Sequence, residues 1–338
     1  MSLASIAALV VVVAFAFVLG ISDAPNASAV LIASRGASYR RAMAFSFVAH
    51  AVGGLLAGQA VALTMTGLVR VPAAQLPGTY LAGAVAGLAF TLVLTRRGVP
   101  VSASIALVGG LAGAALVEAG WRAVGWGGLR GVHPYGVLGV LLAIVISPVL
   151  GGFLAAGLRR ALGRVLHRAS RDVMRSLRAM IWLTAGLVGL ADGSNDGQKA
   201  MGLATAVLVA GGSIRTFAVP FWVRVLVAFA LAAGTAAGGR RIVRTVSSRF
   251  YRCGPLDGVA AQSASAVAIL GSAFLGAPVS TSTVVASSMI GVGAARRRHH
   301  VHWPTVRTVI SAWIVTVPAC AILGACLIGL GRLSGALP

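Results

Sequence analysis

The only lysine of this chain lies in the stretch Gly193-Ser194-Asn195-Asp196-Gly197-Gln198-Lys199-Ala200-Met201-Gly202. This stretch places two amides, a carboxylate and the lysine inside an otherwise apolar part of the sequence. A related stretch, Gly20-Ile21-Ser22-Asp23-Ala24-Pro25-Asn26, interrupts the apolar N-terminal region. An ionised group within a membrane span costs at least about 2.5 kcal/mol, so it is a candidate for function by default. Two such stretches, one in each half of the chain, favour a transporter.

The composition is that of a membrane protein. Of 338 residues, 58% are hydrophobic and 10% are charged, and the mean hydropathy is +0.93. We expect apolar stretches long enough to cross about 30 Å of hydrocarbon near residues 3–35, 43–69, 78–95, 99–120, 134–158, 179–211, 217–239, 255–275, 278–295 and 305–331. Residues 3–20 are expected to be the first membrane helix rather than a secretory signal, because no positively charged region precedes them.

The arginines separate into two sets if these stretches are alternating spans. The connections on one side hold 21 arginines and those on the other side hold 6. The positive-inside rule then places the arginine-rich side, with residues 159–178, in the cytoplasm and both termini outside. Topology therefore accounts for the net charge of +22, and we expect a lipid bilayer but no nucleic acid as partner.

Corresponding motifs in the two halves indicate a duplication. Asp23 and Asp196 are 173 residues apart, and the motifs Pro100-Val101-Ser102 and Pro278-Val279-Ser280 are 178 apart. An odd number of spans in each copy makes the duplication inverted, an architecture that forms binding sites from broken helices at the membrane midplane. The predicted fold is all-α, with ten to twelve transmembrane or re-entrant helices in two inverted repeats, 1–158 and 179–338, joined by a basic cytoplasmic linker at 159–178.

The two stretches that carry the aspartates are long for simple spans. Residues 3–35 and 179–211 would each be about 50 Å long as straight helices, against about 30 Å of hydrocarbon. Glycine-rich sequence surrounds each aspartate. We therefore expect both helices to be broken or re-entrant, with freed backbone groups facing a cavity.

These polar stretches predict a cation site. Carboxylate and amide oxygens are hard ligands that suit a small cation or a proton. The candidates are Asp23, Asn26, Asn195 and Asp196, and the two aspartates are the metal candidates if the ion is Na+. A pair of hydrogen-bonded helix breaks without any ligand is the alternative.

The two Pro-Val-Ser motifs predict an anion site. Proline is favoured in the first turn of a helix, where free N–H groups and the positive end of the helix dipole attract an anion. The candidate ligands of a tetrahedral oxyanion are Ser102, Ser104, Ser280, Thr281 and Ser282; plain serine caps are the alternative. Lys199 either neutralises a carboxylate, contacts the anion or extends to a helix end. His50 stands alone in an apolar stretch, and we expect a packed histidine, with a proton relay as the alternative.

The stretch around Asp196 resembles the Asn-Asp-x-Gln-Lys-x-Met-Gly signature of the inorganic phosphate transporter (Pit) family of secondary carriers. Residues 231–242, 276–281 and 313–318 resemble that family as well, and the resemblance covers nearly the whole chain. It implies a multi-pass protein of a bacterial cell membrane that imports phosphate by symport with Na+ or H+, acts as a homodimer and is not an enzyme. Besides the coupling ion no cofactor is implied, and Gln198 and Lys199 join the hydroxyl residues as phosphate-binding candidates.

The chain departs from the family pattern at two places. Ser22 replaces an amide among the cation-coupling residues, and Pro25 replaces a small residue. The histidine of the family's Ser-Thr-x-His pattern is missing after both prolines. A permease for sulfate or another oxyanion is therefore the alternative function. An intramembrane aspartyl protease is a remote alternative. Such a protease needs two carboxylates that share a proton, but the Tyr-Asp and Gly-x-Gly-Asp pairings that resemble such proteases are absent from this sequence.

Overall fold

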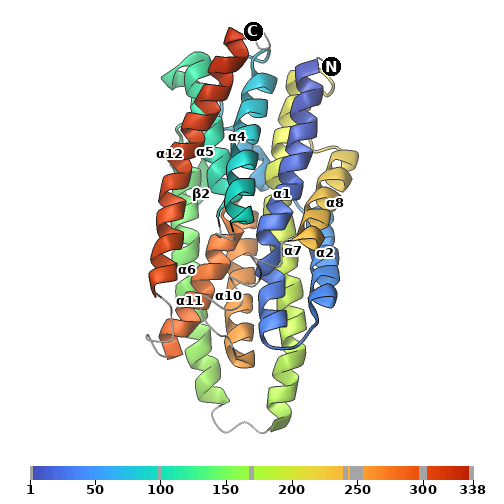
Figure 1. The fold of residues 1–338 in the computed structure, drawn as a ribbon, viewed down its shortest axis with the longest axis vertical. Coiled ribbons are helices and arrows are strands. Elements are labelled where there is room, and N and C mark those ends of the chain that lie inside the picture. Colours follow the sequence, from blue (N-terminus) through green and yellow to red (C-terminus); the bar gives the residue numbers. More distant parts are fainter. Residues whose placement is uncertain are drawn as a thin grey trace.

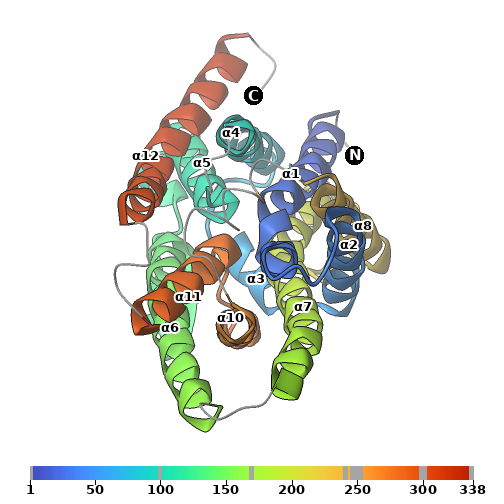
Figure 2. The ribbon, with the colours of Figure 1, turned by 60° about the horizontal axis from the view of Figure 1, so that its bottom comes forward.

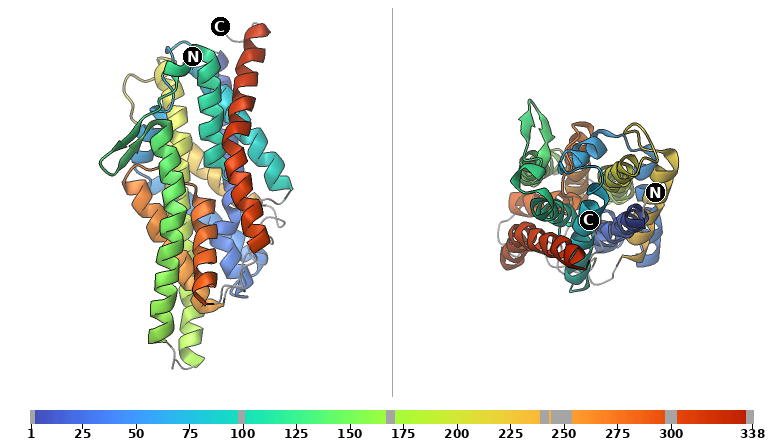
Figure 3. Two further views of the ribbon diagram at one scale, coloured as in Figure 1. Left: turned by 90° about the vertical axis from the view of Figure 1, so that its left-hand side faces the viewer. Right: turned by 90° about the horizontal axis from the view of Figure 1, so that it is seen from above.

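The computed structural model describes residues 3–97, 101–166, 171–238, 243, 254–296 and 303–334, and these residues are mostly helical. The α-helices are α1 (Leu3–Ala33), α2 (Tyr39–Leu56), α3 (Ala60–Thr66), α4 (Leu76–Arg96), α5 (Ala103–Ala119), α6 (Gly136–Val165), α7 (Arg171–Ala210), α8 (Phe221–Ala237), α10 (Pro255–Phe274), α11 (Thr281–Arg296) and α12 (Trp303–Leu333). The all-α class is confirmed, except for a β-hairpin of β1 (Gly128–Arg130) and β2 (His133–Tyr135) that the sequence analysis missed. It lies on the side of the molecule (Figure 3).

The long helices run along one axis of the molecule (Figure 1). Both chain ends lie at one end of this axis, and the end of α6 and the start of α7 lie at the other. The arginine distribution predicts this same-side placement of the chain ends. Because α6 continues to Val165 and α7 begins at Arg171, most of the expected linker at 159–178 belongs to these two helices.

Two helical hairpins approach each other from opposite ends of the molecule. The α4–α5 pair comes from the end that carries the chain termini, and the α10–α11 pair comes from the other end (Figures 1 and 3). Figure 2 shows α10 between α6 and α7, and α10 packs against both. The hairpins meet in the interior, where the Ser104 hydroxyl lies 3.4 Å from the carbonyl oxygen of Val279.

The hairpins correct the expectation that residues 99–120 and 278–295 are long enough to cross the membrane. Helix α5 has 17 residues and α11 has 16, which corresponds to about 25 Å against about 30 Å of hydrocarbon. In the described residues, four helical segments are long and apolar enough to cross, namely Ser5–Ala33, Leu76–Arg96, Gly136–Val165 and Ile310–Leu333. The stretch 43–69 corresponds to the pair α2 and α3, which is bent by 75° and would make a fifth span if the two helices cross together.

The expectation that the aspartate-bearing helices are broken was wrong. Helix α1 is continuous over 31 residues, with Pro25 inside it, and α7 is continuous over 40 residues. The glycines near the aspartates allow close helix crossings instead of unwinding. An ideal Cβ at Gly20 would lie 1.9 Å from the carbonyl oxygen of Leu231 in α8, and one at Gly193 would lie 2.2 Å from that of His50 in α2. Non-helical backbone instead precedes α5 and separates α10 from α11, where the two hairpins meet.

Candidate functional site in the interior

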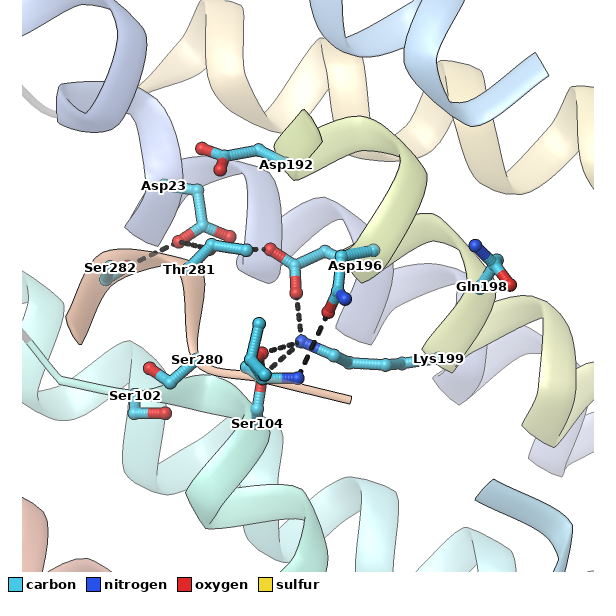
Figure 4. Close-up of polar contacts among 12 residues, drawn as sticks. Asp23, Ser102, Ser104, Asp192, Asp196, Gln198, Lys199, Ser280, Thr281 and Ser282 are labelled. Atoms are coloured by element: carbon cyan, nitrogen blue, oxygen red, sulfur yellow. Dashed lines mark hydrogen bonds and ion pairs between the residues drawn. The ribbon is translucent and has the colours of Figure 1, made fainter. Parts of the chain in front are cut away.

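The buried ammonium group of Lys199 lies where the two hairpins meet. Its side chain is 1% exposed, and its Nζ donates to the Ser104 hydroxyl at 2.7 Å. Nζ also donates to Asp196 Oδ1 and to the carbonyl oxygen of Val279. The lysine therefore joins α7 to both hairpins and neutralises a carboxylate, which is one of its three expected arrangements (Figure 4).

Thr281 and Ser282, in the first turn of α11, contact the carboxylates. The Thr281 hydroxyl donates to Asp196 Oδ2 at 2.8 Å and lies 3.3 Å from Asp23 Oδ1. Ser282 also donates to Asp23 Oδ1. The helix start thus brings the carboxylates of α1 and α7, predicted as a pair from their spacing, onto one group of hydroxyls (Figure 4).

Ser22 and Asn195, which directly precede the two aspartates, hold the hairpin ends. Asn195 donates to the carbonyl oxygen of Ala277 at 3.0 Å and accepts from the N–H of Val279 at 3.3 Å. Ser22 donates to the carbonyl oxygen of Val101 at 3.3 Å. The two residues therefore make equivalent contacts with opposite hairpins, and the serine makes one hydrogen bond where the asparagine makes two.

The serines of the first hairpin and their counterpart in the second are also buried. Ser102 caps α5 by accepting from the N–H of Ile105 at 3.2 Å, which is the expected capping arrangement. Ser104 follows in the first turn, and Ser280 directly precedes α11. All three are at most 5% exposed. Pro100 lies outside the described residues.

Gln198 is not brought into this group. Its Oε1 accepts from the N–H of Val61 at the start of α3, at 3.0 Å, and its Nε2 donates to the carbonyl oxygen of Ser194. Successive helix residues are separated by about 100°, so Gln198 and Asp196 point to different sides of α7. Figure 4 shows the side chain directed away from Lys199.

The structure adds Asp192 and His50, which the sequence analysis did not assign to the site. Both side chains are fully buried, and His50 Nε2 lies 3.7 Å from Asp192 Oδ2. Asn26 connects this pair to the rest, because its Nδ2 donates to Asp192 Oδ2 at 2.8 Å and lies 3.3 Å from Asp23 Oδ1. Helical spacing could have indicated Asp192 as a site residue, because it precedes Asp196 by four residues and therefore shares its face of α7.

With Asp23, Asp192 and Asp196 ionised and His50 neutral, the buried group would carry more negative than positive charge, because among the described residues Lys199 is the cation that contacts it. Buried charges are normally paired or hold cations. In the described part of the chain, Asp23 Oδ2 and Asp192 Oδ1 nevertheless find no hydrogen-bond partner. In the described residues no three His, Cys, Asp or Glu side chains converge as metal ligands. An alkali cation here would also need hydroxyl or carbonyl oxygens, which these helix ends supply.

These features define a helical membrane protein with a polar site buried between two opposed hairpins. A sequence model of the phosphate transporter family matches residues 19–181 and 166–324. The chain therefore belongs to the phosphate transporter family, whose named members are transporters and not enzymes. This family assignment confirms the resemblance inferred from the motifs and excludes the aspartyl protease alternative.

Similar proteins match over most of the chain. A "Probable low-affinity inorganic phosphate transporter" of Rhizobium meliloti is 33% identical, over 92% of this chain and 91% of its own length. A protein of the same name from Mycobacterium bovis is 36% identical, over 97% of this chain and 78% of its own length. A solved structure titled "The sodium-dependent phosphate transporter" has a TM-score of 0.87 and 22% identity, covering 98% of this chain and all of that one. At that identity, the structural likeness establishes the fold.

Proposed function

We propose that this protein imports inorganic phosphate across the cell membrane by symport with Na+ or H+. The observation that carries the proposal is the meeting of the two hairpins at Lys199, where a buried ammonium group and the hydroxyls of two helix starts face two carboxylates. The names of the similar proteins supply phosphate as the substrate.

The hydroxyls and N–H groups at the starts of α5 and α11 are the proposed phosphate ligands. The residues are Ser102, Ser104, Ser280, Thr281 and Ser282, with Lys199 as the cationic partner. Helix starts favour anions through their free N–H groups and positive dipole ends. Phosphate would compete with Asp196 for the Lys199 ammonium group, which is the charge-assisted donor in this region.

Charge balance supports coupling to a cation. A phosphate anion entering a group that already holds three carboxylates and one ammonium would add to an uncompensated negative charge. Asp23 Oδ2, which is buried and finds no hydrogen-bond partner among the residues that the structure describes, is the proposed contact for Na+. The sodium dependence named for the similar solved structure is consistent with this choice.

We also propose that the chain consists of two inverted repeats, with residues 1–158 forming one and 179–338 the other. The support is that helices of one half pack against helices of the other in matched pairs, α1 with α8 and α2 with α7, and likewise α5 with α12 and α6 with α11. A homodimer in a bacterial cell membrane is proposed from the family resemblance, and crosslinking in native membranes tests it.

The test is uptake of radiolabelled phosphate into proteoliposomes, with sodium and proton gradients imposed separately. The wild-type protein should accumulate phosphate under one of these gradients. Asp196→Asn should abolish gradient-driven accumulation while remaining monodisperse in detergent, because it removes the carboxylate that pairs with Lys199. Sulfate as a competitor decides the substrate. Stronger inhibition by sulfate than by unlabelled phosphate would favour the oxyanion alternative, and unchanged accumulation by Asp196→Asn would remove this residue from coupling.

The hydroxyls are tested separately from coupling. Each hydrogen bond lost to a charged oxyanion should cost about 1.5–3 kcal/mol, or roughly ten- to hundredfold in affinity. Ser102→Ala and Ser280→Ala should therefore raise the KM for phosphate far more than the KM for the cation. The double variant should depart from additivity, since both residues would contact one ligand. If both variants bind phosphate as tightly as the wild type, these serines act only as helix caps.

A further inference from the structure

His50 and Asp192 form a buried pair that has no role in the proposed phosphate contacts. Their helices approach closely, since an ideal Cβ at Gly53 would lie 2.2 Å from the carbonyl oxygen of Leu190. Both side chains are fully buried, with His50 Nε2 3.7 Å from Asp192 Oδ2. Among the described residues, His50 Nε2 and Asp192 Oδ1 find no hydrogen-bond partner. Asp192 is four residues from Asp196, and within the same described part of the chain His50 makes its ion-pair contact with Asp192 rather than with either proposed coupling carboxylate.

Hydrogen bonding identifies which nitrogen of His50 is able to take up a proton. His50 Nδ1 lies 2.8 Å from the carbonyl oxygen of Ser46. A carbonyl oxygen only accepts, so Nδ1 carries the hydrogen and a neutral ring leaves a lone pair on Nε2. Asp192 Oδ2, a second acceptor, lies 3.7 Å from Nε2. Two buried acceptors facing each other are unfavourable, and a proton on Nε2 turns the contact into an ion pair.

The other charged groups near α2 leave Asp192 as the counter-ion of His50. Among described side chains, the charged groups on the packed helices are Asp23 on α1, Asp192, Asp196, Lys199 and the exposed Arg178 on α7, and Arg224 on α8. Lys199 is engaged by Asp196, and Arg224 contacts the carbonyl oxygen of Leu55, more than a helical turn beyond His50. Arg40 and Arg41 belong to the first turn of α2 itself, two to three turns before His50.

We propose that His50 and Asp192 form a proton-binding site, with His50 Nε2 taking the proton, and that Asn26 links it to phosphate binding. The inference rests on the proposed function and adds a second positive charge to it, besides a cation at Asp23. Asn26 donates to Asp192 and lies 3.4 Å from the Thr281 hydroxyl. Protonation of His50 neutralises Asp192 and lowers the negative charge that an incoming phosphate must overcome.

Thermodynamic linkage determines the direction in which pH should change the affinity for phosphate. Because a protonated His50 favours the anion, bound phosphate must equally favour the proton on His50. Phosphate binding should therefore draw a proton from solution. One linked proton changes phosphate affinity by at most about tenfold per pH unit, and tighter binding is expected at the lower pH.

The experiment measures proton uptake when inorganic phosphate is added to purified protein in weakly buffered detergent solution containing a pH-indicator dye. The variants are His50→Gln and Asp192→Asn. His133→Gln is the matched control, because His133 is an exposed histidine outside the polar group. Phosphate itself changes charge near neutral pH, so each variant is compared with wild type at the same pH. Wild type and His133→Gln should take up more protons than His50→Gln, by at most about one per chain.

A second measurement needs no variant. Hydrogen–deuterium exchange at the imidazole C2 position, followed by mass spectrometry of the wild-type protein, reports the titration of each histidine. The His50 midpoint should move to higher pH on addition of phosphate, while that of His133 should stay. Equal proton uptake by all proteins, with a His50 midpoint that phosphate does not move, would overturn the proton site and leave phosphate transport standing. Absence of phosphate binding by the wild type at every pH would overturn both.

Discussion

Thr281 is the residue whose hydroxyl reaches both carboxylates of the proposed coupling site. It lies 2.8 Å from Asp196 Oδ2 and 3.3 Å from Asp23 Oδ1, and it is 2% exposed. Asn26 approaches the same hydroxyl at 3.4 Å. The hydroxyl therefore connects α1, α7 and α11 at one point. Its loss would remove the hydroxyl donor of Asp196 Oδ2, whereas Asp23 Oδ1 would keep Ser282 as a donor.

We expect Thr281→Val to weaken phosphate binding by roughly tenfold or more, because a hydrogen bond to a charged group contributes about 1.5–3 kcal/mol. Valine keeps the shape of threonine and removes only the hydroxyl. Thr281→Ser is the matched control, since it keeps the hydroxyl and removes a methyl group, and it should stay near wild type. Isothermal titration calorimetry with phosphate at fixed sodium concentration measures the affinity of both variants. Equal affinities of the two variants would contradict the role of the hydroxyl.

At the scale of the helices, glycines that lie against backbone carbonyl groups of a neighbouring helix allow helices of the two halves of the chain to pack closely. Gly20 of α1 faces the carbonyl oxygen of Leu231, and Gly234 of α8 faces that of Phe17, each with an ideal Cβ 1.9 Å away. Helices α5 and α12 cross in the same way at Gly113, whose Cβ would lie 1.9 Å from the carbonyl oxygen of Ala321. Small residues allow such close approaches between membrane helices. The crossings between α1 and α8 therefore help to position Asp23, which α1 carries.

Gly20→Ala should therefore push α1 away from α8, since backbone atoms are unable to yield as a flexible side chain would. Overpacking of this kind costs about 1–3 kcal/mol, which corresponds to a Tm lower by about 2–10 °C. Gly157→Ala in α6 is the matched control, because a Cβ there meets nothing within 4 Å, and alanine favours a helix over glycine. Thermal unfolding in detergent compares the two. A Gly20→Ala protein as stable as Gly157→Ala would show that α1 and α8 do not cross this closely.

At the scale of the whole molecule, the direction of the hairpins decides which side of the membrane each reaches. The α4–α5 hairpin enters from the end with the chain termini, and the α10–α11 hairpin enters from the end where α6 ends and α7 begins (Figure 1). The arginine counts predict that this second end faces the cytoplasm.

Cysteine labelling tests this orientation. In a background without Cys253, Cys320 and Cys326, an impermeant maleimide added outside intact cells should label Ser334→Cys and spare Arg164→Cys. Both positions are exposed and lie at opposite ends of the molecule. After permeabilisation both should react, which controls for reactivity. Labelling of Arg164→Cys alone in intact cells would reverse the orientation.

Much of the fold of this protein could be predicted from its sequence alone. Apolar length and arginine placement are local properties, and they predicted helices close to those observed, together with chain ends on the same side. The paired motifs predicted that Asp23, Asp196 and the hydroxyls at the helix starts would form interior sites, and the structure brings these side chains together. For Lys199 the sequence allowed three arrangements, and the structure shows it bound to Asp196 and Ser104. These predictions succeeded because an ionised or hydroxyl group in an apolar helix must find a partner inside the protein.

Only the tertiary structure decided which partners these are. His50 and Asp192 are 142 residues apart, and their contact depends on glycines that let α2 and α7 cross closely. The same glycines were interpreted as helix breaks, because sequence does not distinguish a glycine that unwinds a helix from one that admits a neighbouring backbone. Gln198 does not belong to the site, because its side chain accepts a hydrogen bond from the N–H of Val61. Val61 is distant in sequence and lies on another side of α7. Contacts of this kind are set by how helices cross, which no local pattern encodes.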